Sequence, residues 1–309
     1  MKKKLNFLIN KIFFKSLLFV INIFLIFIKI NRNKSLKVCL CTIGKKENVY
    51  ASEFVDHYKK IGYDKIFIYD NNDIEDEKFE DVLYQQISGN FVKIIDYRGY
   101  RGKRQSPQSD AYIDCYEKNK NNYDWLSFFD FDEILELNKN KNIKEYLNNK
   151  QFKKCANIKI NWLEFSDNDL IYYKNISLQK RFTKPLYQDK GNIFIKSTVR
   201  GHLKFNYWRS MSNPHSSSNY LTACNSRGNI IDPTAFYNSP FNYEYSYLKH
   251  YSTKTIEEYC NKIKKGRADL IVKLDTETLK NYYNNFFDRN KNTKEKIDYF
   301  NKAFNFTMS

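Results

Sequence analysis

The feature that most constrains the fold of this sequence is an alternation of short apolar runs with amphipathic stretches between residues 36 and 129. The apolar runs have the length and composition of buried strands, and they cover residues 36–43, 65–69, 91–96 and 125–129. Residues 47–61 and 108–118 have helical character, and Gly62 follows the first of these stretches, as glycine commonly does at a helix end. Strands that alternate with helices form a mostly parallel sheet covered on both faces, so the sequence predicts an α/β fold.

Polar residues follow three of the expected strands, at the edge where parallel α/β sheets bind their ligands. These polar clusters are residues 45–47, 70–73 and 130–133. Asp70 and the two asparagines after it suit hydrogen bonds to a ribose or a base, although Asp and Asn are also ordinary turn residues.

The most informative pair in these clusters is Asp130 and Asp132, which are separated by one residue at the end of an apolar run. Two carboxylates placed in this way can face one cavity and bind a hard divalent cation, which in turn can hold a diphosphate. The same residues would also suit a solvated acidic turn before a helix that begins near Ile134. The pair by itself leaves both readings open.

Other polar residues are weaker candidates for a site. Lys196 and Arg200 follow an apolar patch and could face a phosphate or lie on a solvated strand edge. Among the four histidines, His57 is expected to pack on or beside its helix. The other three lie in loop-like contexts where one could be a third metal ligand, and spacing selects none of them: His202, His215 and His250.

The positive charge of the chain is concentrated at its N-terminus. The formal net charge is +17, and the eleven Lys and Arg residues up to Lys46 are accompanied by no Asp or Glu, which leaves about +6 for the rest. Residues 16–28 carry no charge, and as a helix they would span about 20 Å against roughly 30 Å of hydrocarbon. We therefore expect residues 1–34 to be a membrane anchor, either spanning or in the plane of the membrane surface. A core helix of the main domain is the alternative, and a signal peptide is disfavoured because no small-residue cleavage site follows.

The composition argues against several other classes of protein. The six cysteines include no CxxC pair and no zinc-ligand spacing, and we expect all six to be reduced thiols. No P-loop supports a kinase or an ATPase. The basic excess flanks an apolar run and not a nucleic-acid-binding motif, so no nucleic-acid partner is expected.

Eight stretches of the chain, in order, resemble glycosyltransferase family 92 and its bacterial relatives grouped with family 2. Together they span most of the chain, and they are residues 39–48, 53–73, 107–116, 123–135, 161–169, 195–200, 213–215 and 249–269. The resemblance implies a GT-A fold, a nucleotide-sugar donor such as a UDP-sugar, and Mn²⁺ (or Mg²⁺) at Asp130 and Asp132. It also implies that His215 or His250 completes the metal shell. One departure is Lys46, which stands where family members commonly have Asn.

The resemblance also assigns roles to individual residues. Asp130 is expected near the ribose and the metal, and Asp132 as a direct metal ligand. The other residues expected to bind the donor are Thr42, Glu47, Asp70 and Gln108. Lys196 and Arg200 are expected to bind it as well, if they face a phosphate. An inverting enzyme of this family needs a carboxylate base, for which Asp167 is the first choice and Glu164 the second.

These observations predict three parts: an anchor at residues 1–34, a GT-A glycosyltransferase domain at 35–270, and a helical extension at 271–309 packed on it. The expected activity is inverting transfer of a hexose, with galactose as the first candidate, to a saccharide or glycolipid acceptor during surface-glycan synthesis. The expected location is the cytoplasmic face of a bacterial inner membrane. The alternatives are another nucleotide-dependent transferase, or a non-catalytic basic protein that binds membrane or nucleic acid.

Overall fold

The computed structural model describes residues 35–100, 102, 106–203, 215, 222–266 and 274–307, together with Val20. The predicted anchor at residues 1–34 therefore lies outside the described residues, apart from Val20. Within the part of the chain that is described, no helix combines the length and the apolar character that a membrane span requires.

The described residues form a sheet of ten strands, which is mostly parallel as the sequence predicts. The strands are β1 (Val38–Gly44), β2 (Lys65–Asp70), β3 (Val92–Asp96), β4 (Trp125–Phe128), β5 (Glu133–Leu137), β6 (Asn157–Glu164), β7 (Ile195–Arg200), β8 (Ala223–Asn225), β9 (Ile230–Ile231) and β10 (Ser246–His250). Their order is β3-β2-β1-β4-β7-β6-β10-β5, with β8 beside β6 and β9 beside β8. β7 runs antiparallel between β4 and β6, and β5 runs antiparallel to β10.

The helices are α2 (Asn48–Lys60), α3 (Glu80–Ser88), α4 (Pro107–Asn119), α5 (Ile143–Leu147), α6 (Leu178–Arg181), α7 (Ile256–Lys265), α8 (Thr276–Phe287) and α9 (Lys294–Phe304). The residues at the start of α4 fix where this helix begins. The side chain of Ser106 accepts a hydrogen bond from the backbone N–H of Ser109, and Pro107 occupies the first turn. The ends of α2 and α4 agree with the predicted helices to within one or two residues.

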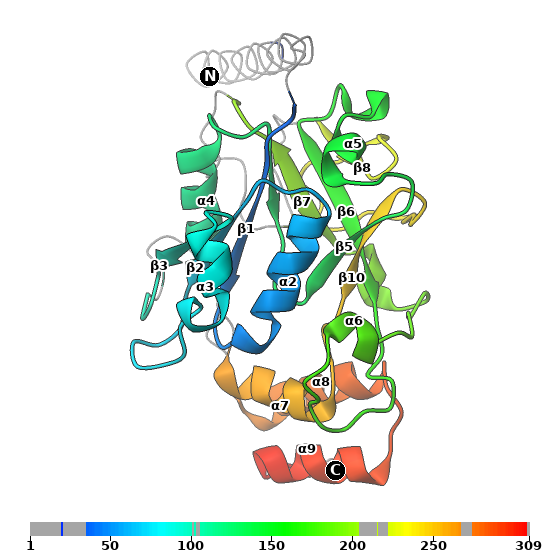
Figure 1. The fold of residues 1–309 in the computed structure, drawn as a ribbon. Coiled ribbons are helices and arrows are strands. Elements are labelled where there is room, and N and C mark those ends of the chain that lie inside the picture. The colour runs from blue at the N-terminus through cyan, green and yellow to red at the C-terminus, as the bar shows by residue number, and fades with distance from the viewer. Residues whose placement is uncertain are drawn as a thin grey trace, which may run out of the picture.

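Helices cover both faces of the sheet, which confirms the predicted α/β class. Alternate side chains of a strand point to opposite faces. Leu40 of β1 therefore packs in the core that includes residues of α2 and α3, and Cys41 packs in the core that includes residues of α4. Figure 1 shows α7, α8 and α9 together beyond the end of the sheet toward which β1 runs. These three helices share an apolar cluster of their own, in which Ile256 and Cys260 of α7 meet Phe286 of α8 and Phe300 of α9.

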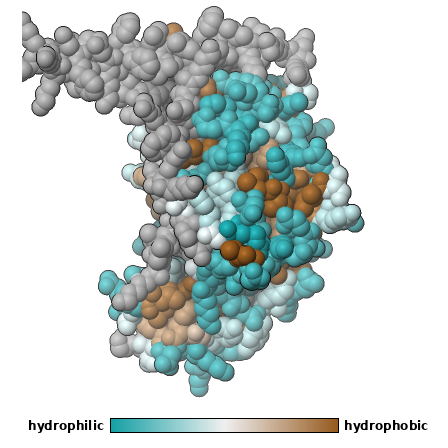
Figure 2. All heavy atoms as spheres, turned by 90° about the vertical axis from the view of Figure 1, so that its left-hand side faces the viewer, coloured by the Kyte–Doolittle hydropathy of each residue, from teal (hydrophilic) through white to brown (hydrophobic). Residues whose placement is uncertain are grey.

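The surface carries the polar residues that the composition supplies. On the face shown in Figure 2, hydrophilic residues predominate and hydrophobic residues gather in separate areas. Single exposed apolar side chains are normal on a folded protein.

One prediction about the cysteines is wrong. Cys155 and Cys224 form a disulfide, with their Cα atoms 5.7 Å apart, whereas Cys39, Cys41, Cys115 and Cys260 are free and buried. β6 and β8 pair in parallel with Ile158 opposite Cys224, and this pairing brings together two thiols that are 69 residues apart. Spacing along the chain does not indicate such a pair, because it depends on which strands become neighbours.

Candidate functional site

The candidate site lies at the edge of the sheet where β4, β6 and β10 end. His250, the last residue of β10, is paired with Glu133 at the start of β5 and with Glu164 at the end of β6. Three titratable side chains far apart in sequence therefore stand in a row across three neighbouring strands. Asp130 and Asp132 lie in the turn between β4 and β5, next to this row.

Phe131, the residue between the two aspartates, anchors this turn in the core. It is 2% exposed, and its ring stacks on that of Phe79 with centroids 5.2 Å apart. Gly44 leaves room for it, because a Cβ at that position would lie 2.6 Å from the Phe131 ring. Because the side chain of Phe131 is held in the core, the side chains of Asp130 and Asp132 contact polar residues instead.

The carboxylate of Asp130 is held by residues from two elements. Its Oδ1 accepts hydrogen bonds from Gln108 Nε2 at 3.0 Å and from the Tyr112 hydroxyl at 2.9 Å, one turn further along α4. Its Oδ2 accepts one from the ammonium of Lys196 on β7 at 2.6 Å. The structure thus brings together three of the residues that the sequence predicts for donor binding, and it adds Tyr112.

Asp132 is nearly buried and is surrounded by cations. Its Oδ2 accepts a hydrogen bond from Lys262 Nζ at 2.8 Å and lies 3.7 Å from Lys254 Nζ, and its Oδ1 lies 3.9 Å from His250 Nε2. Burial raises the pKa of Asp132, but Lys262, Lys254 and His250 outweigh burial and hold the pKa well below its usual value. Asp132 is therefore an anion in this site.

His250 is oriented by a buried carboxylate. Its Nδ1 donates to Glu164 Oε1 at 2.8 Å, and the other oxygen of Glu164 accepts from the Ser252 hydroxyl at 2.6 Å. The imidazole also lies against Trp162, with centroids 4.1 Å apart. Burial lowers the pKa of His250, whereas Glu164 and Asp132 raise it, and the net result is a pKa above the usual value. The bond to Glu164 leaves Nε2 directed toward Asp132.

Of the two histidines expected at the metal, His250 is the one that faces Asp132. His215 directs its Nδ1 to the backbone oxygen of Ile195 at 2.5 Å, and its ring contacts Trp162. Burial, with a further contribution from Lys196, lowers the pKa of His215 to about 3.

The other two histidines lie elsewhere. His57 packs against β5 through the carbonyl of Leu135, as expected for a helix-packing residue. His202 lies 4.0 Å from Asp124, the residue before β4.

Glu133 belongs to the polar cluster 130–133 and to this site, although it is not among the site residues predicted from the sequence. Its side chain is buried, Oε2 accepts from the backbone N–H of Asp130 at 2.9 Å, and Oε1 lies 3.4 Å from Lys196 Nζ. Burial raises the pKa of Glu133 to about 8, despite the opposing effect of Lys196. Its position directly after Asp132 was the one available signal.

Three further predicted donor-binding residues lie at the ends of β1 and β2. Thr42 is fully buried, and its hydroxyl has no hydrogen-bond partner among the described residues. Glu47 is ion-paired with Lys265. Both oxygens of the Asp70 carboxylate contact other residues of the chain. Oδ2 lies 3.0 Å from the Arg98 guanidinium, and Oδ1 accepts a hydrogen bond from Asn72.

Two of the predicted site residues, Arg200 and Asp167, do not lie beside Asp130 and Asp132. Arg200 pairs with Trp125 at the beginning of β4, and its guanidinium donates to the carbonyls of Phe152 and Cys155. Four residues of strand place it about 13 Å along β7 from Lys196, so the two cations do not face one phosphate. Asp167 forms a buried ion pair with Lys296 of α9, at 2.5 Å.

The residues around Asp132 would supply only part of the coordination shell of a divalent cation. Within the described residues, no group of three or more His, Cys, Asp or Glu side chains is placed so that it could hold a metal ion. A hard cation at a nucleotide site, however, often takes only one or two protein ligands and completes its shell with phosphate and water. Asp132 Oδ1 and His250 Nε2 face each other, and a histidine that binds a metal usually donates its other ring N–H to a carboxylate, as His250 does to Glu164.

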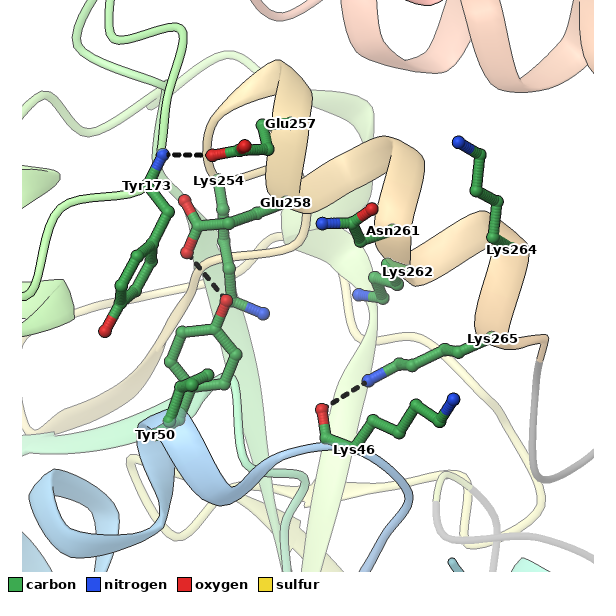
Figure 3. Close-up of a pocket in the computed structure, with 11 residues that line it drawn as sticks. Lys46, Tyr50, Tyr173, Lys254, Glu257, Glu258, Asn261, Lys262, Lys264 and Lys265 are labelled. Atoms are coloured by element: carbon green, nitrogen blue, oxygen red, sulfur yellow. Dashed lines mark hydrogen bonds between the residues drawn. The ribbon is translucent and has the colours of Figure 1, made fainter. Parts of the chain in front are cut away.

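A pocket of about 610 Å³ lies next to Asp132, between the start of α2 and α7 (Figure 3). It is lined by Lys46, Val49, Tyr50, Tyr173, Lys254, Glu257, Glu258, Asn261, Lys262, Lys264 and Lys265. Lys254 and Lys262 belong both to this pocket and to the surroundings of Asp132. These lysines are not among the residues that the sequence analysis singled out, although they fall in the stretch 249–269 that resembles the family.

The sequence of this chain is similar to known glycosyltransferases. The model of glycosyltransferase family 92 matches residues 34–305. A family 92 protein of Oryza sativa subsp. japonica is 26% identical over 118 residues, and one of Ricinus communis is 24% identical over 117 residues. These matches cover 38% and 37% of this chain and 19% of each relative, so they span about a fifth of the relatives' length.

Solved structures are similar at a greater distance. S. aureus TarS 1–349 in complex with UDP-GlcNAc has 11% identity and a TM-score of 0.39, with 87% of this chain and 82% of that chain covered. The mannosyltransferase PcManGT from Pyrobaculum calidifontis, in complex with GDP-Man and Mn²⁺, has 9% identity and a TM-score of 0.29, over 47% and 44% of the two chains. These likenesses are too distant to assign a ligand to this chain. The family model, in contrast, covers nearly all of the described fold, and the chain belongs to glycosyltransferase family 92.

Proposed function

We propose that this protein transfers a hexose from a nucleotide-diphosphate sugar to a saccharide acceptor, with inversion at the anomeric carbon. Galactose from UDP-galactose is the first donor to test. Family membership supports transfer of a sugar, and the arrangement around Asp130 and Asp132 is the observation that carries the proposal. The GT-A fold proposed for it agrees with a mostly parallel sheet that carries this acidic pair after β4.

The charges of the site suit the departure of a nucleoside diphosphate. Breaking the bond between the sugar and the diphosphate leaves negative charge on the leaving group. Fixed cations near that group lower the barrier because they need no rearrangement as the charge develops. Lys196, Lys254 and Lys262 are such cations, each held within 4 Å of Asp130 or Asp132.

Asp132 and His250 would hold the Mn²⁺ or Mg²⁺ of this proposal. A bound divalent cation would act as a Lewis acid that neutralises charge on the diphosphate. Asp130, with both oxygens engaged by Gln108, Tyr112 and Lys196, would position the donor.

The two carboxylates predicted as bases differ in their surroundings. Glu164 is 1% exposed and bonded to His250 and Ser252, so we assign it to orienting His250. Asp167 as the base stays a prediction, and it would require this carboxylate to part from Lys296.

Membrane attachment through residues 1–34, an acceptor that belongs to a surface glycan, and the cytoplasmic face also stay predictions. The Cys155–Cys224 disulfide is a reason to test the opposite face of the membrane, because disulfides persist mainly in oxidising compartments.

The test is sugar transfer by the full chain from a panel of UDP-sugars, with Mn²⁺ and with a chelator. Asp132→Asn keeps the side-chain shape and removes the charge, and we expect it to lower kcat by about 100-fold or more. Asp169→Asn removes an exposed carboxylate paired with Lys184 and Lys291, and it should leave transfer unchanged. If the folded wild-type chain neither binds nor turns over any nucleotide sugar, the transferase proposal fails and a binding role becomes the better account.

A further inference from the structure

A row of aromatic side chains leads away from His250 across β6 and β7. The ring of Trp162 lies 4.1 Å from that of His250 and 5.6 Å from that of Phe194, measured between centroids. The backbone N–H of Trp162 donates to the carbonyl of Phe194 at 3.0 Å, so these two residues are cross-strand neighbours. Phe194 also forms an isolated antiparallel bridge with Tyr237. We call Trp162, Phe194 and Tyr237 the aromatic strip.

The aromatic strip lies on the face of the sheet that carries Lys196. Phe194 has an extended backbone and stands two residues before Lys196, so their side chains point to the same face. Lys196 donates to Asp130, and its ammonium lies 6.0 Å from the centre of the Trp162 ring. Residues directly opposite each other in an antiparallel bridge share a face as well, which places Tyr237 beside Phe194. The strip therefore runs outward from the candidate site on the side of the acidic pair.

The outer rings of the strip are open to solvent. Trp162 is half-buried, whereas Phe194 is 40% exposed and Tyr237 is 56% exposed. Single exposed apolar side chains need no explanation, but a row of them that is continuous with a polar site is typical of a ligand-binding surface. The exposure of these rings therefore points to a ligand that reaches the candidate site.

The loop that carries Tyr237 is fixed by buried polar side chains of β6. The fully buried Lys159 donates from its ammonium to three backbone carbonyls of residues 232–235, at 3.1, 2.8 and 2.7 Å. The side chain of Asn161 donates to the carbonyl of Asn238 at 3.1 Å and accepts from the side-chain amide of Asn238 at 2.9 Å. These bonds hold the loop in position, and a surface that is already ordered loses less conformational freedom when a ligand binds.

The size and charge of the strip favour a neutral sugar. The two lysines beside it are engaged, Lys196 by Asp130 and Lys159 by the loop carbonyls. At about 150–250 Å² for a whole aromatic side chain, the exposed parts of three rings fall well short of the roughly 800 Å² that each partner contributes to a stable protein interface. A sugar ring has apolar C–H faces that stack on an aromatic ring, while its hydroxyls stay at the edge for water or polar groups.

We propose that the aromatic strip is the acceptor subsite of this protein, on which neutral sugar rings of the acceptor saccharide stack. The inference rests on the proposed transferase function, because that function supplies the acceptor. Trp162, next to His250, takes the sugar whose hydroxyl receives the transferred hexose, and Phe194 and Tyr237 take the sugars that follow it. The protein therefore favours acceptors of two or more sugar units over a monosaccharide.

The first measurement is binding of the full chain to an array of immobilised neutral and acidic glycans. The wild type should bind neutral glycans of two or more sugar units. Phe194→Ser and Tyr237→Ser should each weaken this binding about five- to tenfold, the effect of losing about 50 Å² of apolar contact. Tyr237→Phe keeps the ring and should stay within about twofold of the wild type.

Tyr84→Ser is the matched control. It removes an aromatic ring that is 74% exposed on α3, and α3 packs against β3 at the opposite edge of the sheet from β10 and β5. Glycan binding by this variant should stay at the wild-type value. Thermal melts of all variants establish that they are folded.

The second measurement is steady-state transfer to a neutral glycan that the array identifies, with hydrolysis of the same UDP-sugar as the internal reference. Phe194→Ser and Tyr237→Ser should each raise the KM for the acceptor about five- to tenfold and change kcat less. Their loss of transfer at low acceptor concentration should exceed any loss of hydrolysis, because water as the acceptor needs no stacking surface.

The outcomes separate the subsite from the transferase. Wild-type acceptor KM in both folded serine variants, or equal losses in Tyr84→Ser, would overturn the subsite and leave the transferase proposal standing. Binding confined to acidic glycans, or to no glycan on the array, would overturn a stacking surface for neutral sugars. Glycan binding that depends on Phe194 and Tyr237, in a chain that neither transfers nor hydrolyses any nucleotide sugar, would support the aromatic strip and count against the transferase.

Discussion

At the scale of single residues, the site depends on side chains whose partners fix their direction. Glu164 holds the imidazole of His250, and the imidazole in turn directs Nε2 toward Asp132. Carboxylates that orient a ligating histidine commonly set metal affinity or activity without touching the metal. Glu164 is therefore a positioning residue in our proposal.

Glu164→Gln tests this role. We expect transfer activity or affinity for Mn²⁺ to fall by about 10- to 100-fold, because a neutral amide fixes the imidazole less firmly than a carboxylate. The measurement is the Mn²⁺ concentration for half-maximal transfer, beside a thermal melt. Ser252→Ala removes the weaker partner of Glu164 and should change this concentration less. An unchanged Mn²⁺ dependence in Glu164→Gln would contradict the positioning role.

At the scale of elements, α7 is held in place by one buried carboxylate. Glu258 forms a capping box with Thr255, accepts from both terminal nitrogens of the Arg181 guanidinium, and accepts from Tyr50 of α2. Burial raises the pKa of Glu258, but the bonds from Arg181 and Tyr50 outweigh burial and leave the pKa below its usual 4.5. The helix that carries the pocket lysines is thus fixed by an ionised acid.

This arrangement predicts acid sensitivity. The folded-state pKa of Glu258 lies below the unfolded-state value, so its stabilisation is fully present above about pH 4.5 and is lost as the pH falls through the folded-state pKa. Glu258→Gln should lower the free energy of unfolding at neutral pH by about 3–5 kcal/mol, because Arg181 is left buried without its charge partner. Urea unfolding of both proteins from about pH 7 to about pH 3 provides the measurement. A wild-type profile as shallow as that of the variant would show that Glu258 is not the group responsible.

At the scale of the whole molecule, the order of the strands in the sheet determines which residues become neighbours. The antiparallel β7 between β4 and β6 places Lys196 beside Asp130 and carries Arg200 to the other end of the sheet. The same sheet brings β8 beside β6 and closes the disulfide between Cys155 and Cys224.

The disulfide gives a prediction for the molecule as a whole. The denatured, oxidised chain should expose four free thiols and the reduced chain six, which a thiol titration counts. Because the bridge closes a long loop in the unfolded chain, oxidation should raise the free energy of unfolding by about 2–4 kcal/mol, as measured in urea with and without reductant. Cys155→Ser/Cys224→Ser should match the reduced protein. Six titratable thiols in protein purified without reductant would contradict the bridge.

The sequence by itself determined the α/β class, the first four strands, the helices α2 and α4, and the place of Asp130 and Asp132 at a strand end. These features follow from local periodicity, which a strand or helix carries within its own residues. Only the tertiary structure decided that Glu133, His250 and Glu164 stand in one row, that α7 brings Lys262 to Asp132, and that Arg200 lies elsewhere. Each of these depends on pairing or packing between segments far apart in the chain, and local patterns carry no information about which segments become neighbours.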